Sequence, residues 1–435
     1  QLSDDDFVDT WDQIKDLVAM VDMKMEELDK PKMSFFEVLT AMAIWKFADA
    51  PVDVAIVEVG MGGRWDATNV LDADAAIIGP IDMDHMAWLG NTVEQIASEK
   101  VGIIKPGCTA VIGRQPHEEA VMPIIEEAAR QNHANLVRDG IEAEVVTRIP
   151  AVGGQVATLR TPNGTYAEVP IAKFGEHQAH NALAALCAAE VVIPVNGALD
   201  GDLVAEALST VRIPGRIEQI RTSPTIILDG GHNVNAAESL RAAIEENYDF
   251  QQLVGVIAMM GDKQVEEYLG VLEPLLSHVV VTENSWRDRV MPAEDLKTVA
   301  ERVFGAERVT CVPELPDAIQ EAVNMVDADD ELGVGYGHGV LICGSFTTAG
   351  DARLMLEEKV NPDLKKPKSE RVFQEAVEPK PRKDQDEADL DFESDANPDF
   401  DINDFGSVGP DLAEDEDADA SEVEHADAAS SEDVR

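Results

Sequence analysis

Residues 54–69 read VAIVEVGMGGRWDATN, and this segment restricts the possible folds more than any other part of the chain. Its apolar first half is typical of a buried strand in a parallel sheet, and the glycines that follow permit the sharp turn at which such a strand ends. Glu58 stands just before these glycines. Because open α/β sheets bind ligands at the carboxyl ends of their strands, we expect Glu58 at a ligand site. The alternative is a turn in which Glu58 is simply solvated.

The rest of the chain alternates between strand-like and helix-like segments. Short apolar runs predict strands over 52–59, 75–79, 109–113, 225–229, 253–259, 278–283 and 339–345. Helical spacing of apolar residues predicts helices over 7–30, 35–47, 118–132, 176–192, 201–210, 236–247, 265–276 and 293–304. Residues 155–171 are typical of a hairpin that turns at Asn163-Gly164. This alternation predicts an α/β fold with parallel sheets and right-handed crossovers.

Two changes in composition divide the chain into three parts. Residues 213–225, IPGRIEQIRTSPT, interrupt the alternation, so we expect one domain over 1–217 and a second over 218–360. Beyond residue 360 the chain becomes rich in Pro and Lys, and then almost continuously acidic with few apolar residues. Such a segment buries too little apolar surface to offset its ordering entropy, so residues 361–435 are predicted to form a disordered acidic tail.

The net charge of −51 does not come from this tail alone. The 25 acidic and 8 basic residues after position 360 account for −17, which leaves −34 on residues 1–360. Distributed carboxylates with few lysines predict adaptation to high cytoplasmic salt, because salt screens their mutual repulsion. A basic protein partner is the alternative. No basic patch is present to meet phosphates, so nucleic-acid binding is not expected.

Several further classes are excluded by simple features. No uncharged apolar run is long enough to span a bilayer, and no basic-then-apolar signal peptide opens the chain, so neither membrane association nor secretion is expected. The four cysteines lie far apart and form no CxxC pair; they are Cys108, Cys187, Cys311 and Cys343. Free thiols in a reducing cytoplasm are therefore favoured over a zinc site. We expect a monomeric cytoplasmic protein.

Six short motifs follow one another in a characteristic order. They are EVGMGGRWDATN (58–69), DHMAWLG (84–90), EKVGIIK (99–105), HQAHN (177–181), GR (215–216) and LDGGHN (228–233). Together they resemble folylpolyglutamate synthase/dihydrofolate synthase, a family of the Mur-ligase superfamily, and the resemblance extends over residues 34–355. It implies a Mur-ligase-type parallel-sheet ATPase domain followed by a Rossmann-like C-terminal domain. The reaction it implies joins L-glutamate to a folate or dihydropteroate carboxylate through an acyl phosphate, with ATP and Mg²⁺ as cofactors.

The resemblance also implies the residues that hold the metal. Glu58 and His85 would hold magnesium ions on the ATP phosphates, and Lys100, which is usually carbamylated in the family, would act beside them as a metal ligand and catalytic residue. Mg²⁺ prefers oxygen ligands, so the role of His85 depends on the family rather than on ion chemistry. Taken alone, His85 is as typical of a structural histidine, and Lys100 of a solvated ion pair on a helix.

The remaining motifs imply nucleotide and substrate contacts. Asn181 and Asp229 would contact the nucleotide, Arg216 would reach across to the phosphates, and His232 would lie near the incoming amino acid; Arg216 and His232 are also expected to be catalytic. Taken alone, HQxxN is also typical of the polar start of an amphipathic helix.

The other substrate contacts depend on two further strings. SFFEVLTAMA (34–43) resembles the pteridine-binding string of the family, which gives Phe36 as an aromatic wall and Asp66 as a polar anchor. Ser345 in CGSFTTAGDAR is a weaker match to a substrate-binding string. A buried amphipathic helix explains Phe36 equally well.

One feature of the superfamily does not occur in the chain. No glycine-rich phosphate loop ending in Gly-Lys-Ser/Thr is present, and Gly62-Gly63-Arg64 lacks the lysine that such a loop needs. We therefore expect the ATPase domain to be incomplete at its N-terminus and a phosphate loop to be encoded upstream of Gln1. The alternatives are another Mur-type amino-acid ligase and a catalytically incomplete, ligase-like binding protein.

Overall fold

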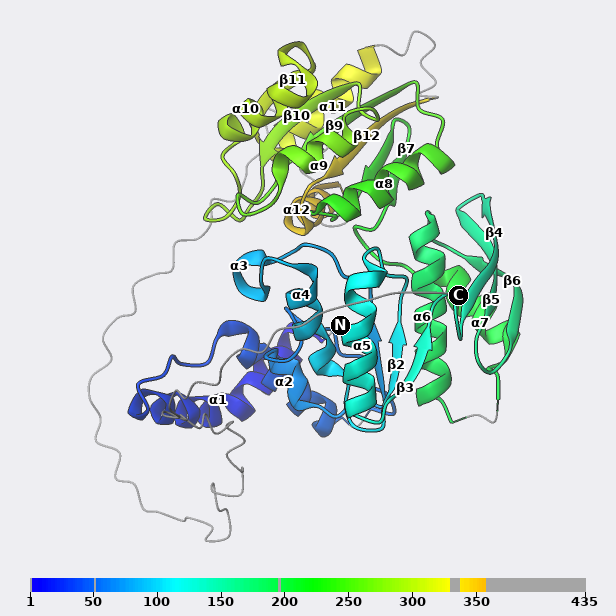
Figure 1. Cartoon of the computed structure of the whole chain (residues 1–435). Helices are drawn as coiled ribbons and strands as arrows, with labels where there is room; N and C mark the ends of the chain where they lie inside the picture. Colours follow the sequence, from blue (N-terminus) through cyan, green and yellow to red (C-terminus); the bar gives the residue numbers. More distant parts are fainter. Residues whose placement is uncertain (1, 51, 195–196, 329–336, 357–435) are drawn as a thin grey trace, which may run out of the picture. The chain divides into compact units, whose positions relative to one another are not determined.

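Three β-sheets organise the part of the chain that the computed structural model describes, which is residues 2–50, 52–194, 197–328 and 337–356 (Figure 1). Two of these sheets have three strands and one has six. The predicted tail over 361–435 lies outside the described residues. The predicted domain boundaries at 217 and 360 stay predictions.

The first sheet is parallel, with the strand order β1-β2-β3. Its strands are β1 (Ala75–Ile78), β2 (Thr109–Ile112) and β3 (Asn135–Arg138). Helices α4 (Val93–Lys100) and α5 (Glu118–Gln131) lie along the chain between them, and apolar side chains of β1, β2, α4 and α5 share one buried core. This packing fixes the loops that follow β1 and β2, and both loops contribute to the candidate site.

The predicted buried strand over 52–59 is wrong. In the structure these residues pair with no strand of the described chain, and Ile56 keeps 91% of its surface exposed. An apolar run becomes a strand only if a neighbouring strand satisfies its N–H and C=O groups, and the composition of the run cannot reveal that neighbour. Glu58 is consequently an exposed residue in an unpaired segment.

The second sheet is antiparallel, with the order β4-β5-β6. Strands β5 (Gly154–Arg160) and β6 (Thr165–Ile171) confirm the predicted hairpin, and β4 (Glu144–Ala151) adds a third strand that was not predicted. Helices α6 (Glu176–Val192) and α7 (Gly201–Thr210) begin and end as predicted. Side chains of β5, β6, α6 and α7 form a core in which Leu159 and Leu183 are almost fully buried.

The third sheet has the order β11-β10-β9-β12-β8-β7. Its strands are β7 (Glu218–Thr222), β8 (Thr225–Leu228), β9 (Gln252–Ile257), β10 (His278–Glu283), β11 (Val309–Glu314) and β12 (His338–Cys343). The expected all-parallel, Rossmann-like arrangement is wrong in one respect, because β7 runs antiparallel to β8 and makes the sheet mixed. Strand β7 lies in the segment that was interpreted as a boundary.

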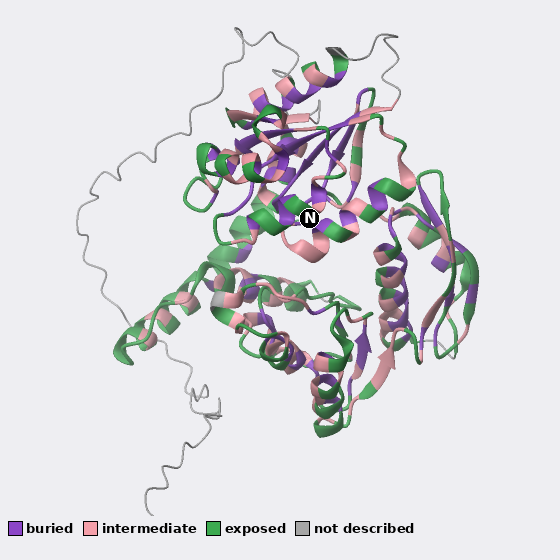
Figure 2. Cartoon of the chain, turned by 45° about the horizontal axis from the view of Figure 1, so that its top comes forward, coloured by how far each residue is buried: buried purple, intermediate pink, exposed green. Residues whose placement is uncertain are grey.

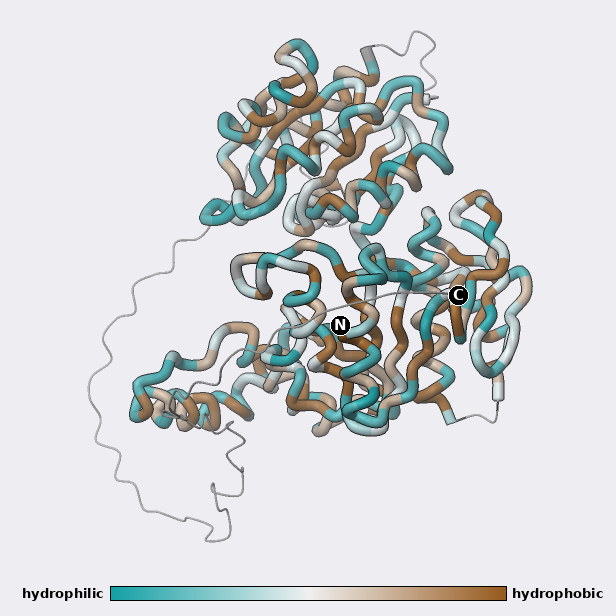
Figure 3. Tube along the Cα trace, viewed as in Figure 1, coloured by the Kyte–Doolittle hydropathy of each residue, from teal (hydrophilic) through white to brown (hydrophobic). Residues whose placement is uncertain are grey.

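Helices cover both faces of this six-stranded sheet. One core includes side chains of α8 (Val234–Asn247), α9 (Val265–Leu272) and α10 (Ala293–Phe304), and the other includes those of α11 (Leu315–Ala328) and α12 (Phe346–Leu356). The central strands are buried and apolar as a result (Figures 2 and 3). The sequence predicted most of these elements but missed β7, β11, α11 and α12.

Two helices precede the first sheet. They are α1 (Asp4–Glu27) and α2 (Phe35–Asp49), and they agree with the predicted segments. Ser34 and Glu37 form the reciprocal bonds of a capping box at the start of α2, which confirms the sequence signal. Among the described residues, no helix combines the length and apolar character that crossing a bilayer requires.

The acidic composition leads to a prediction about stability. Because residues 1–360 carry a net charge of −34, their mutual repulsion should destabilise the folded state at low ionic strength. We expect the thermal midpoint to rise by about 10 °C or more between low and molar KCl, a shift that corresponds to several kcal/mol. Sucrose, which does not screen charge, is the control and should not reproduce the rise. Equal midpoints at both KCl concentrations would refute the prediction.

Candidate active site

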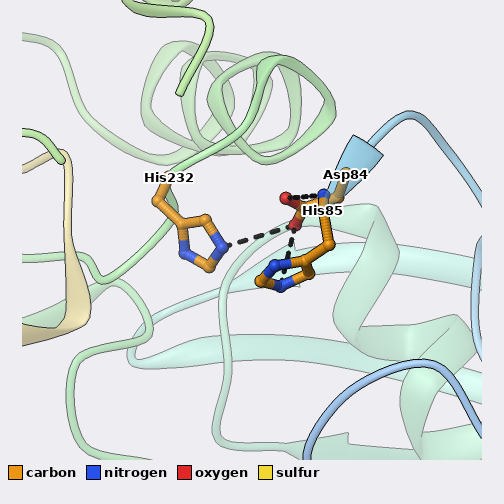
Figure 4. A group of neighbouring side chains, drawn as sticks. All are labelled: Asp84, His85 and His232. Carbon is orange, nitrogen blue, oxygen red and sulfur yellow. Dashed lines mark hydrogen bonds and ion pairs between the residues drawn. The ribbon is translucent and has the colours of Figure 1, made fainter. Parts of the chain in front are cut away.

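Asp84 is the centre of a polar cluster formed by loops that follow three different strands. Figure 4 shows two members of this cluster beside it, His85 and His232. It lies in the loop after β1, whereas His232 and Asn233 follow β8 and Lys263 follows β9. The Lys263 Nζ donates to Asp84 Oδ1 over 2.7 Å. On the other oxygen, Asp84 Oδ2 lies 3.4 Å from His232 Nε2 and 3.3 Å from Asn233 Nδ2. One carboxylate thus joins residues almost 150 and 180 positions away in the sequence.

Local backbone features hold these side chains in place. Asn233 caps α8, with its Oδ1 accepting from the Ala236 N–H at 2.9 Å. His85 adopts a left-handed conformation with φ of 51°, directly before the short helix α3 (Met86–Leu89), and its N–H donates to Asp84 Oδ1 at 2.8 Å. Such a conformation is costly for a residue other than glycine, and strain of this kind gathers at functional sites.

Asp84 is held in its charged form. Burial alone would raise the pKa of its carboxyl group, but the hydrogen bonds from His232 and Lys263 and the positive charge of Lys263 outweigh burial and lower the pKa strongly. An anion at this position pairs with the Lys263 ammonium, whose side chain is only 9% exposed. The cluster is therefore a partly desolvated ion pair with two imidazoles beside it, and such a pair resists rearrangement because either charge alone would be costly.

Among the described residues, this cluster has enough donor atoms to hold a metal ion. Asp84, His85 and His232 each offer a ligand atom, and these atoms lie within 4.8 Å of one another. The donor set fits Mg²⁺ only in part, since Asp84 supplies the preferred oxygen while the two imidazoles supply nitrogen; phosphate oxygens and water would have to complete the shell. The predicted ligand His85 belongs to the group. Glu58 and Lys100 do not.

Lys100 is the last residue of α4 and lies close to the glycine-rich segment. Its side chain makes no hydrogen bond or ion pair with the described residues, and burial lowers the pKa of its ammonium group. The neighbouring motif is packed tightly onto the same helix end: the Arg64 N–H donates to Glu99 O at 2.9 Å, and a Cβ on Gly63 would come within 2.7 Å of that oxygen. Only glycine at position 63 allows this approach.

A cleft of about 730 Å³ runs along α6. His177, His180 and Asn181 line it from α6, Gly79 and Gly113 from the ends of β1 and β2, and residues of α8 from the other side. Asn181, the predicted nucleotide contact, is exposed to this space. At one side, Arg148 of β4 forms two hydrogen bonds with Glu246 of α8, of 2.5 and 2.8 Å. The cleft is large enough for a nucleotide.

The Arg216 guanidinium has no ion-pair partner among the described residues, whereas the Asp229 carboxylate is already hydrogen-bonded. The Arg216 guanidinium lies over the Phe346 ring, 4.1 Å from its centroid, and has no ion-pair partner among the described residues, so its charge remains available. The Asp229 carboxylate is buried and already engaged, because it accepts the Ile217 N–H at 3.0 Å and the Gly231 N–H at 2.8 Å. Burial raises the pKa of Asp229. Asp229 thus ties the segment of Arg216 to the segment of His232.

Of the other three predicted substrate residues, Phe36 and Asp66 contact the same segment around Gly60 and Met61, whereas Ser345 lies in a different part of the fold. The Phe36 ring covers Gly60, where a Cβ would lie 2.4 Å from ring atom Cζ. The Asp66 carboxylate closes its own loop, accepting from the Met61 N–H at 2.9 Å and from Thr68, at the start of the 3-10 helix η1 (Ala67–Val70). Ser345 is only 3% exposed and accepts the Thr347 N–H. Neither Asp66 nor Ser345 presents a free polar group.

The structure therefore gathers some predicted residues and not others. His85 and His232 meet at Asp84, Asn181 lines the cleft, and Arg216 keeps an unpaired charge. Asp84 itself and Lys263 were not assigned as site residues from the sequence. The available signals were their positions, since Asp84 precedes His85 in its motif and Lys263 follows an apolar strand within a GDK string.

The partly buried imidazole of His177, which lines the cleft along α6, leads to a pH prediction. Burial, reinforced by the charge of Arg216, lowers its pKa from 6.5 to about 4. Between these values the unfolded chain binds the proton and the folded chain does not, so stability falls as the pH is lowered from 6.5 toward 4, by at most about 1.4 kcal/mol per pH unit. We expect His177→Gln to flatten the dependence of the unfolding free energy on pH between 5 and 6.5. Urea melts measure it, and parallel slopes for both proteins would contradict it.

Two family models match the chain. One described as Mur ligase middle domain matches residues 12–189, and one described as Mur ligase, glutamate ligase domain, matches residues 215–346. The first match ends before the segment that carries Arg216, and the second match begins at Gly215 and includes Arg216. They cover the elements that supply Asp84 and Asn181 and those that supply His232 and Lys263, respectively.

Curated and solved relatives agree with these matches. The dihydrofolate synthase/folylpolyglutamate synthase of Mycobacterium tuberculosis is 43% identical over 365 residues, which are 80% of this chain and 74% of that protein. A structure of Mycobacterium tuberculosis folylpolyglutamate synthase complexed with ADP aligns with a TM-score of 0.77 at 43% identity, covering 82% of this chain and 79% of the other. Escherichia coli FolC in complex with DHPP and ADP aligns with a TM-score of 0.63 at 27% identity, covering 76% and 72%.

Proposed function

Because the chain belongs to the dihydrofolate synthase/folylpolyglutamate synthase family of Mur ligases and is an ATP-dependent glutamate ligase, we propose that its reaction centre is the cluster around Asp84. The observation that carries this proposal is the meeting of Asp84 with His232, Asn233 and Lys263, which come from the two segments matched by different family models. A ligase of this kind must bring ATP, an acid and an amine together, and a site built from both segments meets that need.

ATP occupies the cleft along α6 in this proposal. Asn181 is exposed in the cleft and supports a contact with the base, and the unpaired guanidinium of Arg216 supports a contact with the phosphates. The ADP-bound relatives support the nucleotide class. Asp229 acts as a positioning residue, because its two oxygens hold the backbone segments of Arg216 and His232 at a fixed separation.

Mg²⁺ is the proposed metal, with Asp84 and His85 as its protein ligands beside phosphate oxygens and water. When bound, it would neutralise phosphate charge during transfer. The roles of Glu58 and Lys100 as ligands stay predictions. Among the described residues, Glu58 forms no hydrogen bond or ion pair, and its side chain is exposed.

The chemistry divides into two transfers. The substrate carboxylate attacks the γ-phosphorus of ATP, and ADP leaves, which gives an acyl phosphate. The glutamate amine then attacks the acyl carbon, the carbon–nitrogen bond forms, the proton leaves the nitrogen, and phosphate is released. Lys263 and Arg216 supply positive charge toward the transferring phosphoryl group, and Asp84 orients His232 toward the incoming amine. Phe36 and Asp66 remain the proposed pteridine contacts. Ser345 remains a proposed substrate contact, although its burial does not support that role.

The acceptor is proposed to be dihydropteroate or tetrahydrofolate, and the DHPP-bound relative supports a folate-type acceptor.

We further propose a monomer in a reducing, salt-rich cytoplasm. Cysteines 108, 187, 311 and 343 are free, which supports the reducing compartment, and the acidic composition supports the high salt.

The decisive experiment is ATP-dependent incorporation of labelled L-glutamate into each acceptor separately, with the protein in molar KCl. We expect incorporation that requires ATP and releases one ADP per glutamate. L-aspartate in place of glutamate and omission of the acceptor are the controls. If neither acceptor is glutamylated under conditions where the protein is folded, the proposed substrates are wrong.

A further inference from the structure

A second cleft, of about 960 Å³, lies beside the segment that leads from α7 into β7. Residues 172–174, 209–213 and 217–222, together with Gly153, line it, and we call it the hinge cleft. It shares no lining residue with the cleft along α6. The mechanism outlined above uses none of its side chains, so its chemistry needs a separate explanation.

The charged groups that line the hinge cleft are mostly cations. They are Lys173, Arg212 and Arg221, with Glu218 as the one carboxylate. This excess is unusual in a chain with 85 acidic and 34 basic residues. The Glu218 carboxylate is already engaged, since it accepts the Gly215 N–H at 2.9 Å and lies 3.2 Å from the Arg353 Nε. The hinge cleft is therefore a positive site on an otherwise acidic protein.

Lys173 is the most informative of these residues. Its side chain is buried, with 9% of the residue exposed, and its Nζ donates to the Ile213 carbonyl at 3.1 Å. Among the described residues, no carboxylate lies within ion-pair distance of it, although an ammonium has three N–H groups to satisfy. Burying an ammonium is costly, and burial lowers the pKa of Lys173 although the charge of Glu218 opposes this shift.

Arg212 adds a second cation with no partner of its own. Its side chain is exposed at the hinge cleft and makes no hydrogen bond or ion pair with the described residues. Arg221, by contrast, already donates from Nε to the Ser223 carbonyl at 2.8 Å. A buried ammonium and a free guanidinium facing one space are the groups that recognise a phosphate or carboxylate.

We propose that the hinge cleft binds a small oxyanion, phosphate or carboxylate, with Lys173 and Arg212 as its main ligands. Lys173 already holds the carbonyl of Ile213, three residues before Arg216. An anion on Lys173 would fix the segment that carries Arg216, and it would form the direct ion pair that Lys173 does not make with any described carboxylate. If the proposed function holds, the reaction offers two sources of such an anion: released phosphate and the γ-glutamyl chain of the product.

Equilibrium dialysis with radiolabelled phosphate tests the site directly. The full-length protein is saturated with a non-hydrolysable ATP analogue, so that phosphate positions in the α6 cleft are filled, and ionic strength is held constant with KCl. We expect one phosphate per chain, binding about tenfold weaker in Arg212→Gln, as loss of a charge-assisted bond implies. Lys173→Met should abolish it. Arg302→Gln, an exposed cation on α10 paired with Glu266, is the matched control and should bind like the parent.

A second arm separates the two sources. Tri-γ-glutamate is offered as a competitor of phosphate, and the analogue in which its carboxylates are replaced by carboxamides is the control without negative charge. If tri-γ-glutamate displaces phosphate and the control does not, the γ-glutamyl chain is a ligand of the site. If neither displaces phosphate, phosphate itself is the source of the anion.

Because Arg212 is exposed and unpaired, its variant should fold even if Lys173→Met does not. Absence of bound phosphate and peptide, or equal binding by parent and Arg212→Gln, overturns the proposal. Binding is measured without turnover, so glutamate-ligase activity with no anion bound at the hinge cleft rejects this site and leaves the proposed function standing.

Discussion

Replacing Asp84 with asparagine is expected to lower kcat by about 10²- to 10³-fold, the cost typical of losing one preorganised electrostatic group in a reaction centre. The carboxylate binds Lys263 at 2.7 Å and lies 3.4 Å from His232. Asparagine fills the same space but carries no charge, so it leaves the Lys263 ammonium partly buried and unpaired and lets the imidazole turn. Initial rates of ADP release against glutamate and ATP concentration measure the effect.

The pattern of the loss distinguishes a reaction-centre role from a structural one. We expect kcat to fall by a larger factor than the KM for ATP rises, because Asp84 does not line the cleft along α6 and would touch ATP only through the proposed Mg²⁺ on its phosphates. Asp82→Asn is the matched control: this carboxylate lies in the same loop and pairs with His117 at 3.0 Å instead. Comparable kcat values for Asp84→Asn and Asp82→Asn would show that the cluster is not the reaction centre.

A double variant tests the ion pair itself. In Asp84→Asn, the unpaired Lys263 should contribute to instability as well as to lost activity, because a partly buried charge without a partner is costly. Adding Lys263→Met should restore part of the thermal midpoint but none of the turnover. The coupling energy from the four proteins then separates the structural part of the pair from the catalytic part.

Local signals in the sequence predicted local structure well. The capping residues Ser34 and Glu37 mark the start of α2, and Asn163-Gly164 marks the turn between β5 and β6. In both cases the information lies within a few residues of the element, where capping bonds and turn conformations are decided. The missed β11 and α11 follow each other without an intervening turn signal, so no local feature separated them.

Predictions that depended on distant partners were less complete. The apolar run of 52–59 reads as a strand, but pairing depends on a neighbour that the run does not encode. Asp84 becomes a centre only because α8 and α9 begin beside it, and that meeting arises from the packing of elements almost 150 residues apart. The family motifs gave His85 and His232 separate roles, and only the structure brings them together at Asp84, which belongs to the motif DHMAWLG but was given no role of its own.

Lys100→Ala is expected to lower kcat by about 10³-fold if Lys100 acts beside the phosphates as the resemblance implies. The structure supplies a physical reason to expect unusual chemistry there. The amine is partly buried, and burial lowers its pKa although the charge of Asp84 opposes this shift; no hydrogen bond or ion pair with a described residue holds it. A larger neutral fraction favours attack of the amine nitrogen on CO₂, which forms an N-carboxylate and releases one proton. The product would exchange a cation for an anion at the end of α4.

This reaction predicts a dependence on CO₂ that a simple cationic role would not produce. Activity of the parent protein should fall in CO₂-depleted buffer and return on adding bicarbonate, and the intact mass under native conditions should include one CO₂ per chain. Lys105→Met is the matched control, since Lys105 donates to the Asn69 carbonyl at 2.7 Å within the same motif and should change stability without changing the CO₂ response. Turnover that ignores CO₂ but still disappears in Lys100→Ala would assign Lys100 as a cation toward phosphate. Full turnover in Lys100→Ala would remove it from the mechanism altogether.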